Sequence, residues 1–114
     1  MSNFVMLLVE DDPLEREVLS VSLRQEGFEV VECATAEAAE LIVASTGTEL
    51  RALVTDQNLA GSMTGAELAK FAREKHPNLD IIVISGEDVP ALPKGSIFLC
   101  KPFPPQRLLD AVRH

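Results

Sequence analysis

Four short stretches of this 114-residue sequence carry residue types that can bind a metal or a phosphate, and each directly follows an apolar run. In chain order they hold Glu10 and Asp11, then Asp56, then Ser85, then Lys101. Carboxylates brought close together repel one another unless a cation balances them. Oxygen ligands without nearby His or Cys favour a hard cation such as Mg²⁺, which is bound by one or two carboxylates and phosphate oxygens.

The same residue types also suit phosphoryl transfer. A carboxylate can act as a nucleophile and form an acyl phosphate. An ammonium group neutralises one phosphoryl oxygen, and a hydroxyl donates to another. Taken singly, Glu10 to Asp12 could be a helix cap and Lys101 a surface charge; the recurrence after four apolar runs favours a site.

The apolar runs alternate with helical patterns. Strands are expected at Phe4–Val9, Phe28–Val31, Leu50–Thr55, Asp80–Ile84 and Ser96–Cys100. Helices are expected from Asp12-Pro13 to Gly27, from Thr35 to about Ser45, from Thr64 to about Lys75, and from Pro104-Pro105 onward, with only a weak one in the irregular stretch Glu87 to Lys94. This order predicts one α/β domain over residues 1–114, a doubly wound five-stranded parallel sheet. Ligands of such sheets bind beyond the carboxyl ends of the strands.

Composition excludes several function classes. The net charge of −8 argues against a nucleic-acid surface and against binding to an anionic membrane. No apolar run approaches the length of a membrane span, and the first four residues do not resemble a signal peptide. Cys33 and Cys100 do not form a disulfide framework; we expect buried free thiols and a reduced, cytoplasmic location.

Over its whole length, the chain resembles the receiver domain of bacterial response regulators. The resemblance rests on four segments: Leu7-Leu8-Val9-Glu10-Asp11-Asp12-Pro13, Val54-Thr55-Asp56, Ile82-Val83-Ile84-Ser85-Gly86 and Lys101-Pro102-Phe103. It implies a flavodoxin-like fold and a signalling switch, not an enzyme beyond its own phosphorylation and dephosphorylation. It also implies Mg²⁺ as cofactor, a histidine kinase or histidine phosphotransfer protein as phosphodonor, and a downstream partner that the sequence leaves unknown.

The resemblance assigns roles to individual residues. Asp56 matches the phosphoacceptor, Ser85 the switch hydroxyl, Phe98 the switch aromatic and Lys101 the lysine that accompanies them. For the metal, Asp11 matches a direct ligand, Glu10 a ligand through water, and Asn58 the position whose backbone carbonyl completes the site. Asp12 is assigned to the helix cap because it precedes Pro13. Phe98 fits an ordinary core position equally well.

Two positions are expected to set the lifetime of the acyl phosphate. They lie two residues past Asp56 and two past Ser85, and are Asn58 and Glu87, as in the chemotaxis response regulator. The resemblance implies a short-lived phosphorylated state. Two exposed polar residues without such a role would explain the pair equally well.

The sequence also departs from the family pattern. The loop from Gln57 to Gly65 is one residue longer than the commonest form, and the stretch Glu87 to Gly95, with Pro90 and Pro93, predicts a shortened fourth helix. These departures keep an alternative open, an unphosphorylated pseudo-receiver that serves as a protein-interaction module. An aspartyl phosphatase is disfavoured because Asn58 stands where a second Asp is common. A flavin-binding domain is disfavoured because no Gly-rich phosphate loop is present.

Overall fold

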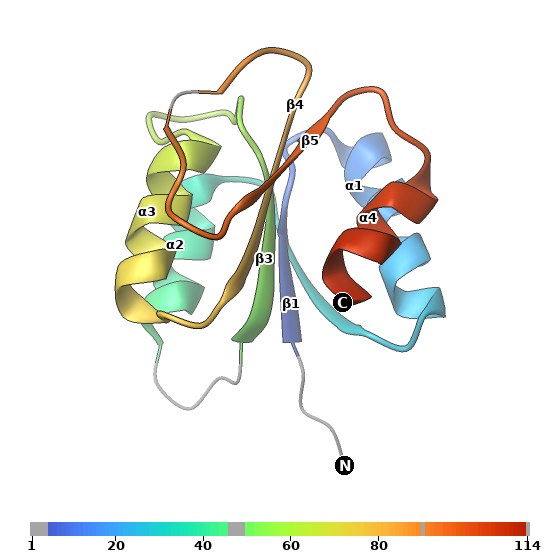
Figure 1. Cartoon of the computed structure of the whole chain (residues 1–114), viewed down its shortest axis with the longest axis horizontal. Helices are drawn as coiled ribbons and strands as arrows, with labels where there is room; N and C mark the ends of the chain where they lie inside the picture. Colours follow the sequence, from blue (N-terminus) through green and yellow to red (C-terminus); the bar gives the residue numbers. More distant parts are fainter. Residues whose placement is uncertain (1–4, 46–49, 90, 114) are drawn as a thin grey trace.

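The chain forms one parallel sheet in the computed structural model, which describes residues 5–45, 50–89 and 91–113 (Figure 1). Its strands are β1 (Val5–Val9), β2 (Glu29–Cys33), β3 (Leu50–Asp56), β4 (Asp80–Ser85) and β5 (Ile97–Cys100). They lie in the order β2-β1-β3-β4-β5, and every neighbouring pair is parallel. The predicted five-stranded, doubly wound sheet is confirmed; Phe4, the predicted start of the first strand, lies outside the described residues.

Four helices connect or follow these strands: α1 (Pro13–Gln25), α2 (Ala36–Ala44), α3 (Gly65–Lys75) and α4 (Pro105–Arg113). Three of them begin at a side chain that caps the free backbone N–H groups of the first turn: Asp12, Thr35 and Thr64. In Figure 1, α2 and α3 cover one face of the sheet, and α1 and α4 cover the other. Asp12 and Thr35 thus start α1 and α2 shortly after β1 and β2 end, whereas Thr64 starts α3 after the loop that follows β3.

The two faces of the sheet bury separate apolar clusters because successive side chains of a strand point to opposite faces. Leu7, Leu53 and Val83 pack with α2 and α3. Leu8 and Val54 pack with α1 and α4. Burial on both faces explains why these strands read as continuous apolar runs in the sequence. It also leaves the strand ends as the places where polar groups can gather.

The connection between β4 and β5 contains no helix in the parts that the structure describes, residues 86–89 and 91–96. A weak, shortened helix was expected here, and this expectation is wrong for the described residues, which form none. Proline lacks a backbone N–H, and Pro93 falls where a helix would need one; Pro90 lies outside the described residues. Instead of a helical face, Val89 and Leu92 pack on the α2 and α3 side of the core.

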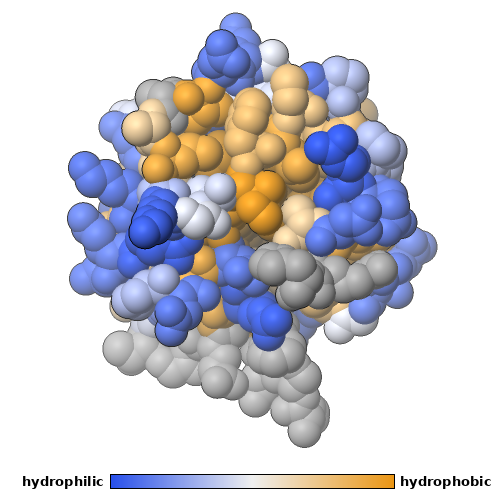
Figure 2. Space-filling model, in the orientation of Figure 1, coloured by the Kyte–Doolittle hydropathy of each residue, from blue (hydrophilic) through white to orange (hydrophobic). Residues whose placement is uncertain are grey.

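Phe98 is 38% exposed, so its interpretation as an ordinary core residue is wrong. Its partner in β4 is Val83, whose side chain belongs to the α2 and α3 side. The described part of the connection between β4 and β5 has no helix that could cover this part of the face. Figure 2, in the same orientation as Figure 1, shows apolar side chains gathered in the upper middle of the view, around β5.

The two cysteines differ in exposure. Cys33 is buried at 7% exposure, as predicted, and its thiol is free. Cys100 is also free but exposed, which corrects the expectation of burial, because β5 is an edge strand with a burial pattern that alternates at its end. No helix within the described ranges is both long enough and apolar enough to cross a membrane.

Candidate functional site

The strand register brings the predicted site residues to one edge of the sheet. Val9 pairs with Thr55, so Glu10 and Asp56 lie at the same level. Asp56 pairs with Ile84, and Ser85 therefore follows one position further along β4. Ser85 in turn pairs with Cys100, directly before Lys101. Parallel pairing thus gathers residues that are up to about 90 positions apart in sequence, as the apolar runs predicted.

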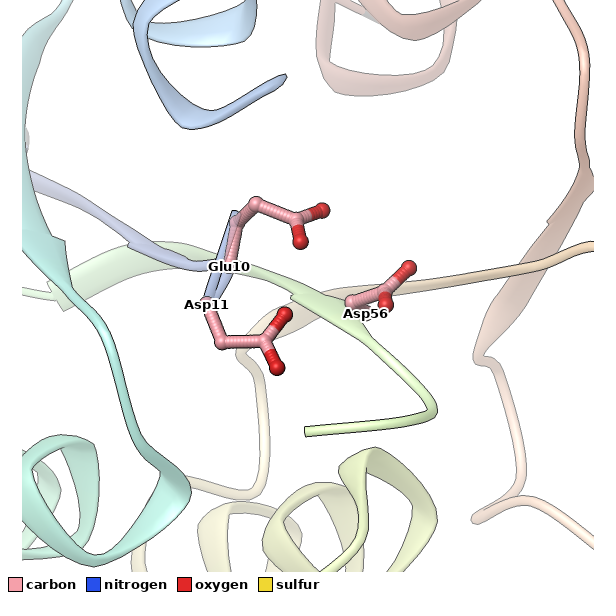
Figure 3. A group of neighbouring side chains, drawn as sticks. All are labelled: Glu10, Asp11 and Asp56. Carbon is pink, nitrogen blue, oxygen red and sulfur yellow. The ribbon is translucent and has the colours of Figure 1, made fainter. Parts of the chain in front are cut away.

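Three carboxylates form the centre of this edge (Figure 3). Glu10 and Asp11 leave the end of β1, and Asp56 stands at the end of β3; one oxygen from each lies within 4.8 Å of the others. Glu10 and Asp56 are 2% and 7% exposed, whereas Asp11 is open to solvent. Two of the three charges are therefore withdrawn from water, which is costly without a balancing cation.

Backbone groups supply only part of the balance. The Asp12 N–H donates to Glu10 Oε2 at 3.1 Å, and the Ala60 N–H donates to Asp11 Oδ2 at 3.1 Å. Glu10 Oε1 is buried and has no hydrogen-bond partner among the described residues. An all-oxygen set with an unpartnered buried oxygen and no His or Cys fits a hard divalent cation such as Mg²⁺.

Lys101 supplies the one ammonium group among the contacts of this cluster in the described chain. Its Nζ lies 2.8 Å from Asp56 Oδ1, 3.0 Å from Glu15 Oε1 and 3.9 Å from Glu10 Oε1. The side chain is 30% exposed, so the pairs are partly screened by solvent. The lysine stands beside the carboxylate of Asp56, where it can also meet an anion bound there.

The electrostatics follow from burial and these contacts. Burial raises the pKa of Glu10 to about 7, since it outweighs the lowering by the Asp12 N–H and by Lys101, and the charge of Asp56 adds to it. Burial also raises the pKa of Asp56, against the lowering effect of Lys101. For Lys101, burial lowers the pKa, but the contacts with Asp56 and Glu15 prevail and raise it above its ordinary value.

Ser85 is 2% exposed, and its hydroxyl oxygen accepts a hydrogen bond from the Glu87 N–H at 3.0 Å. A hydroxyl that accepts one bond still has its own proton to donate. The backbone of the same residue accepts from the Lys101 N–H at 2.8 Å. The pairing of β4 with β5 therefore holds the backbone of Ser85 next to that of Lys101.

The remaining predicted residues lie around this centre. Asn58 and Glu87 are both exposed, in the bends that follow β3 and β4. Asp12 accepts from the N–H groups of Leu14 and Glu15, which agrees with its assignment to the helix cap. Phe98 lies on β5, three residues before Lys101, with the exposure given above.

Sequence reasoning missed two residues of the site. Glu15 contacts Lys101, although a Glu in the first turn of a helix is ordinarily explained by the helix dipole alone. Gly65 packs against the backbone of Asp56, where a Cβ atom would meet the Asp56 carbonyl oxygen. A glycine opening a helix was the available signal for that close approach.

Glu37 tethers the long loop that follows β3. Its Oε2 accepts from the Ser62 N–H at 3.2 Å and from the Ser62 hydroxyl at 3.0 Å. A hydrogen bond from its own backbone, then those from Ser62, lower the pKa of Glu37. Together with the Ala60–Asp11 bond, this contact joins the loop to α2 and to the end of β1. Two carboxylates, Asp11 and Glu37, thus hold this loop.

Comparisons with known proteins agree with this architecture. The family model described as response regulator receiver domain matches residues 6–113. The response regulator protein FleR of Pseudomonas aeruginosa is 36% identical over 96% of this chain, which spans about a quarter (24%) of FleR. The chain therefore belongs to the response regulator receiver domain family, the receiver class of two-component signalling.

Solved structures show the same fold. A response regulator receiver protein from Sinorhizobium medicae superposes with a TM-score of 0.89 at 28% identity, covering 97% of this chain and 92% of that one. The receiver domain of the hybrid histidine kinase CckA gives a TM-score of 0.83 at 31% identity, covering 96% and 95%. Both are receivers with this sheet topology.

Proposed function

We propose that this domain is a phosphorylation-dependent switch that accepts a phosphoryl group on Asp56 in a Mg²⁺-dependent reaction. The observation that carries the proposal is the contact of 2.8 Å between Asp56 Oδ1 and Lys101 Nζ beside an acidic pair with an unpartnered buried oxygen. The phosphodonor we propose is a phosphohistidine on a histidine kinase or a histidine phosphotransfer protein. The downstream partner is a protein that recognises the phosphorylated state.

Asp11 and Asp56, with the backbone carbonyl of Asn58, would hold Mg²⁺ directly, and Glu10 would hold it through water. Bound Mg²⁺ supplies positive charge that balances the carboxylates and the phosphoryl oxygens. The acidic set fits this role because its oxygens lie within 4.8 Å of one another and no softer ligand is in the group.

In the transfer itself, a carboxylate oxygen of Asp56 attacks the phosphorus as the bond from phosphorus to the histidine nitrogen breaks. That nitrogen keeps the electron pair of the broken bond. Lys101 and the hydroxyl proton of Ser85 stabilise the charge spread over the phosphoryl oxygens. An ionised carboxylate has no proton to lose, so its attack needs no general base.

Phosphorylation then shifts the population between two states of the domain. The dianion attracts the Ser85 hydroxyl, which in the described structure accepts from the Glu87 N–H. We propose that this movement makes room for Phe98, which is 38% exposed, to turn inward. The short lifetime implied by Asn58 and Glu87 stays a prediction.

Intact mass after incubation with acetyl phosphate or phosphoramidate tests the proposal, with Mg²⁺ and with EDTA. Wild type and an Asp88→Asn variant, which removes an exposed carboxylate outside the cluster, should each gain one phosphoryl group with Mg²⁺ only. Asp56→Asn should gain none, because its amide cannot form the acyl phosphate. Absence of the gain in wild type, together with failure to bind Mg²⁺, would favour the unphosphorylated pseudo-receiver instead.

A further inference from the structure

Glu15 contacts the proposed site but has no part in the mechanism above. It lies in the first turn of α1, and its Oε1 is 3.0 Å from Lys101 Nζ. Its side chain is 48% exposed, so neither burial nor core packing explains where it lies. The contact joins α1 to the residue that follows β5, 86 positions away in the sequence.

The usual local role of a Glu at this position is taken by another residue. Glu15 is the third helical residue after the cap Asp12, where a Glu commonly accepts the N–H of the cap residue. Helix α3 shows that arrangement, since the Thr64 N–H donates to Glu67 at 2.8 Å. In α1 the Asp12 N–H donates to Glu10 Oε2 instead, and Glu15 extends to Lys101.

The ammonium group of Lys101 is consequently shared between carboxylates. Asp56 Oδ1 lies at 2.8 Å and Glu15 Oε1 at 3.0 Å, with Glu10 Oε1 further away at 3.9 Å. An ammonium has three N–H donors. Two of these donors can be taken by Asp56 and Glu15, so a phosphoryl oxygen beside Lys101 meets an ammonium whose charge Glu15 already partly balances.

We infer that Glu15 is a positioning residue that holds part of the Lys101 ammonium in the unphosphorylated domain and thereby slows phosphoryl transfer to Asp56. This inference rests on the proposed function, because it concerns the rate of that reaction. Glu15 acts through Lys101 and touches neither Asp56 nor the phosphoryl group.

The test is the rate of phosphorylation by phosphoramidate at saturating Mg²⁺, followed by intact mass. Glu15→Gln keeps the shape of the side chain and removes its charge, and should react roughly two- to fivefold faster than wild type, as expected for a partly exposed ion pair. Glu17→Gln is the matched control, since Glu17 is an exposed carboxylate two residues away on the same helix. It should react at the wild-type rate.

A second background separates action through Lys101 from repulsion of the donor. In Lys101→Met, followed over longer incubation, adding Glu15→Gln should leave the residual rate unchanged, because the shared ammonium is gone. An increase that persisted there would overturn the positioning role and assign the effect to repulsion of the donor alone.

The remaining outcomes are also distinct. A phosphorylated wild type whose rate matches or exceeds that of Glu15→Gln would overturn this inference and leave the proposed function standing. A wild type that takes no phosphoryl group would overturn the proposed function, and the inference with it.

Discussion

The carboxylate of Asp56 has Lys101 on one side and the pair Glu10 and Asp11 on the other, and the two sides balance charge in different ways. On the lysine side, one ammonium lies within 3.0 Å of two carboxylates. On the acidic side, two backbone N–H groups donate to the carboxylates of Glu10 and Asp11, and Glu10 Oε1 has no hydrogen-bond donor within the described chain. The lysine side therefore has a cation in direct contact with its carboxylates, whereas the proposed Mg²⁺ would balance the acidic side.

The largest expected effect is a pH dependence of stability on the acidic side. The pKa of Glu10 is raised from 4.5 to about 7 in the folded state without metal. The folded protein then binds more protons than the unfolded chain between these values, so stability should fall as pH rises from about 4.5 to 7. At about 1.4 kcal/mol per pKa unit, Glu10 would contribute a loss on the order of 3 kcal/mol.

Urea unfolding in EDTA at pH 5 and pH 8 measures this loss. Glu10→Gln should show a smaller decrease than wild type, and Mg²⁺ should restore wild type at pH 8. The raised pKa of Asp56 acts in the same direction, so part of the decrease should remain in the variant. Equal pH dependence in wild type and Glu10→Gln would mean that Glu10 does not carry the unbalanced charge.

A smaller effect on stability is expected from a substitution at Gly65, which packs against the backbone of Asp56. An added Cβ would meet the carbonyl oxygen of Asp56 and would lie 2.9 Å from Gln57 Cα. Because these are backbone atoms, Gly65→Ala should cost roughly 1–3 kcal/mol of stability. Gly86→Ala is the control, because its nearest neighbour is Lys101 Cβ at 3.9 Å. Similar urea midpoints for the two variants would show that the Asp56 backbone yields easily.

The smallest effects should have opposite signs on the two sides. In EDTA at pH 8, Asp11→Asn relieves repulsion from Glu10 and Asp56 and should stabilise the domain by less than about 1 kcal/mol. Lys101→Met removes the cation nearest to Asp56 and, because Lys101 is partly exposed, should destabilise the domain by about 1 kcal/mol. Urea unfolding of both variants measures the difference. Effects of the same sign would contradict the division of the site into a side that has its own cation and a side that depends on a bound one.

Much of the site could be predicted because it depends on local patterns. Apolar runs mark the ends of buried strands, and parallel strands bring those ends to one edge. This reasoning predicts that Glu10, Asp56, Ser85 and Lys101 lie together at that edge. It failed for Cys100 and for the core interpretation of Phe98, because their exposure depends on what covers β5 and not on the residues beside them.

The amino-acid sequence by itself determined the strand order along the chain, the capped helix starts and the residues at the strand ends. Each of these is set by neighbours within a few positions. Only the tertiary structure decided that Gly65 lies against Asp56 and that Glu15 extends to Lys101. These features depend on contacts between distant segments. Glu15 and Glu67 hold equivalent positions in their helices, and what distinguishes them is the neighbouring Glu10, which takes the cap N–H of α1.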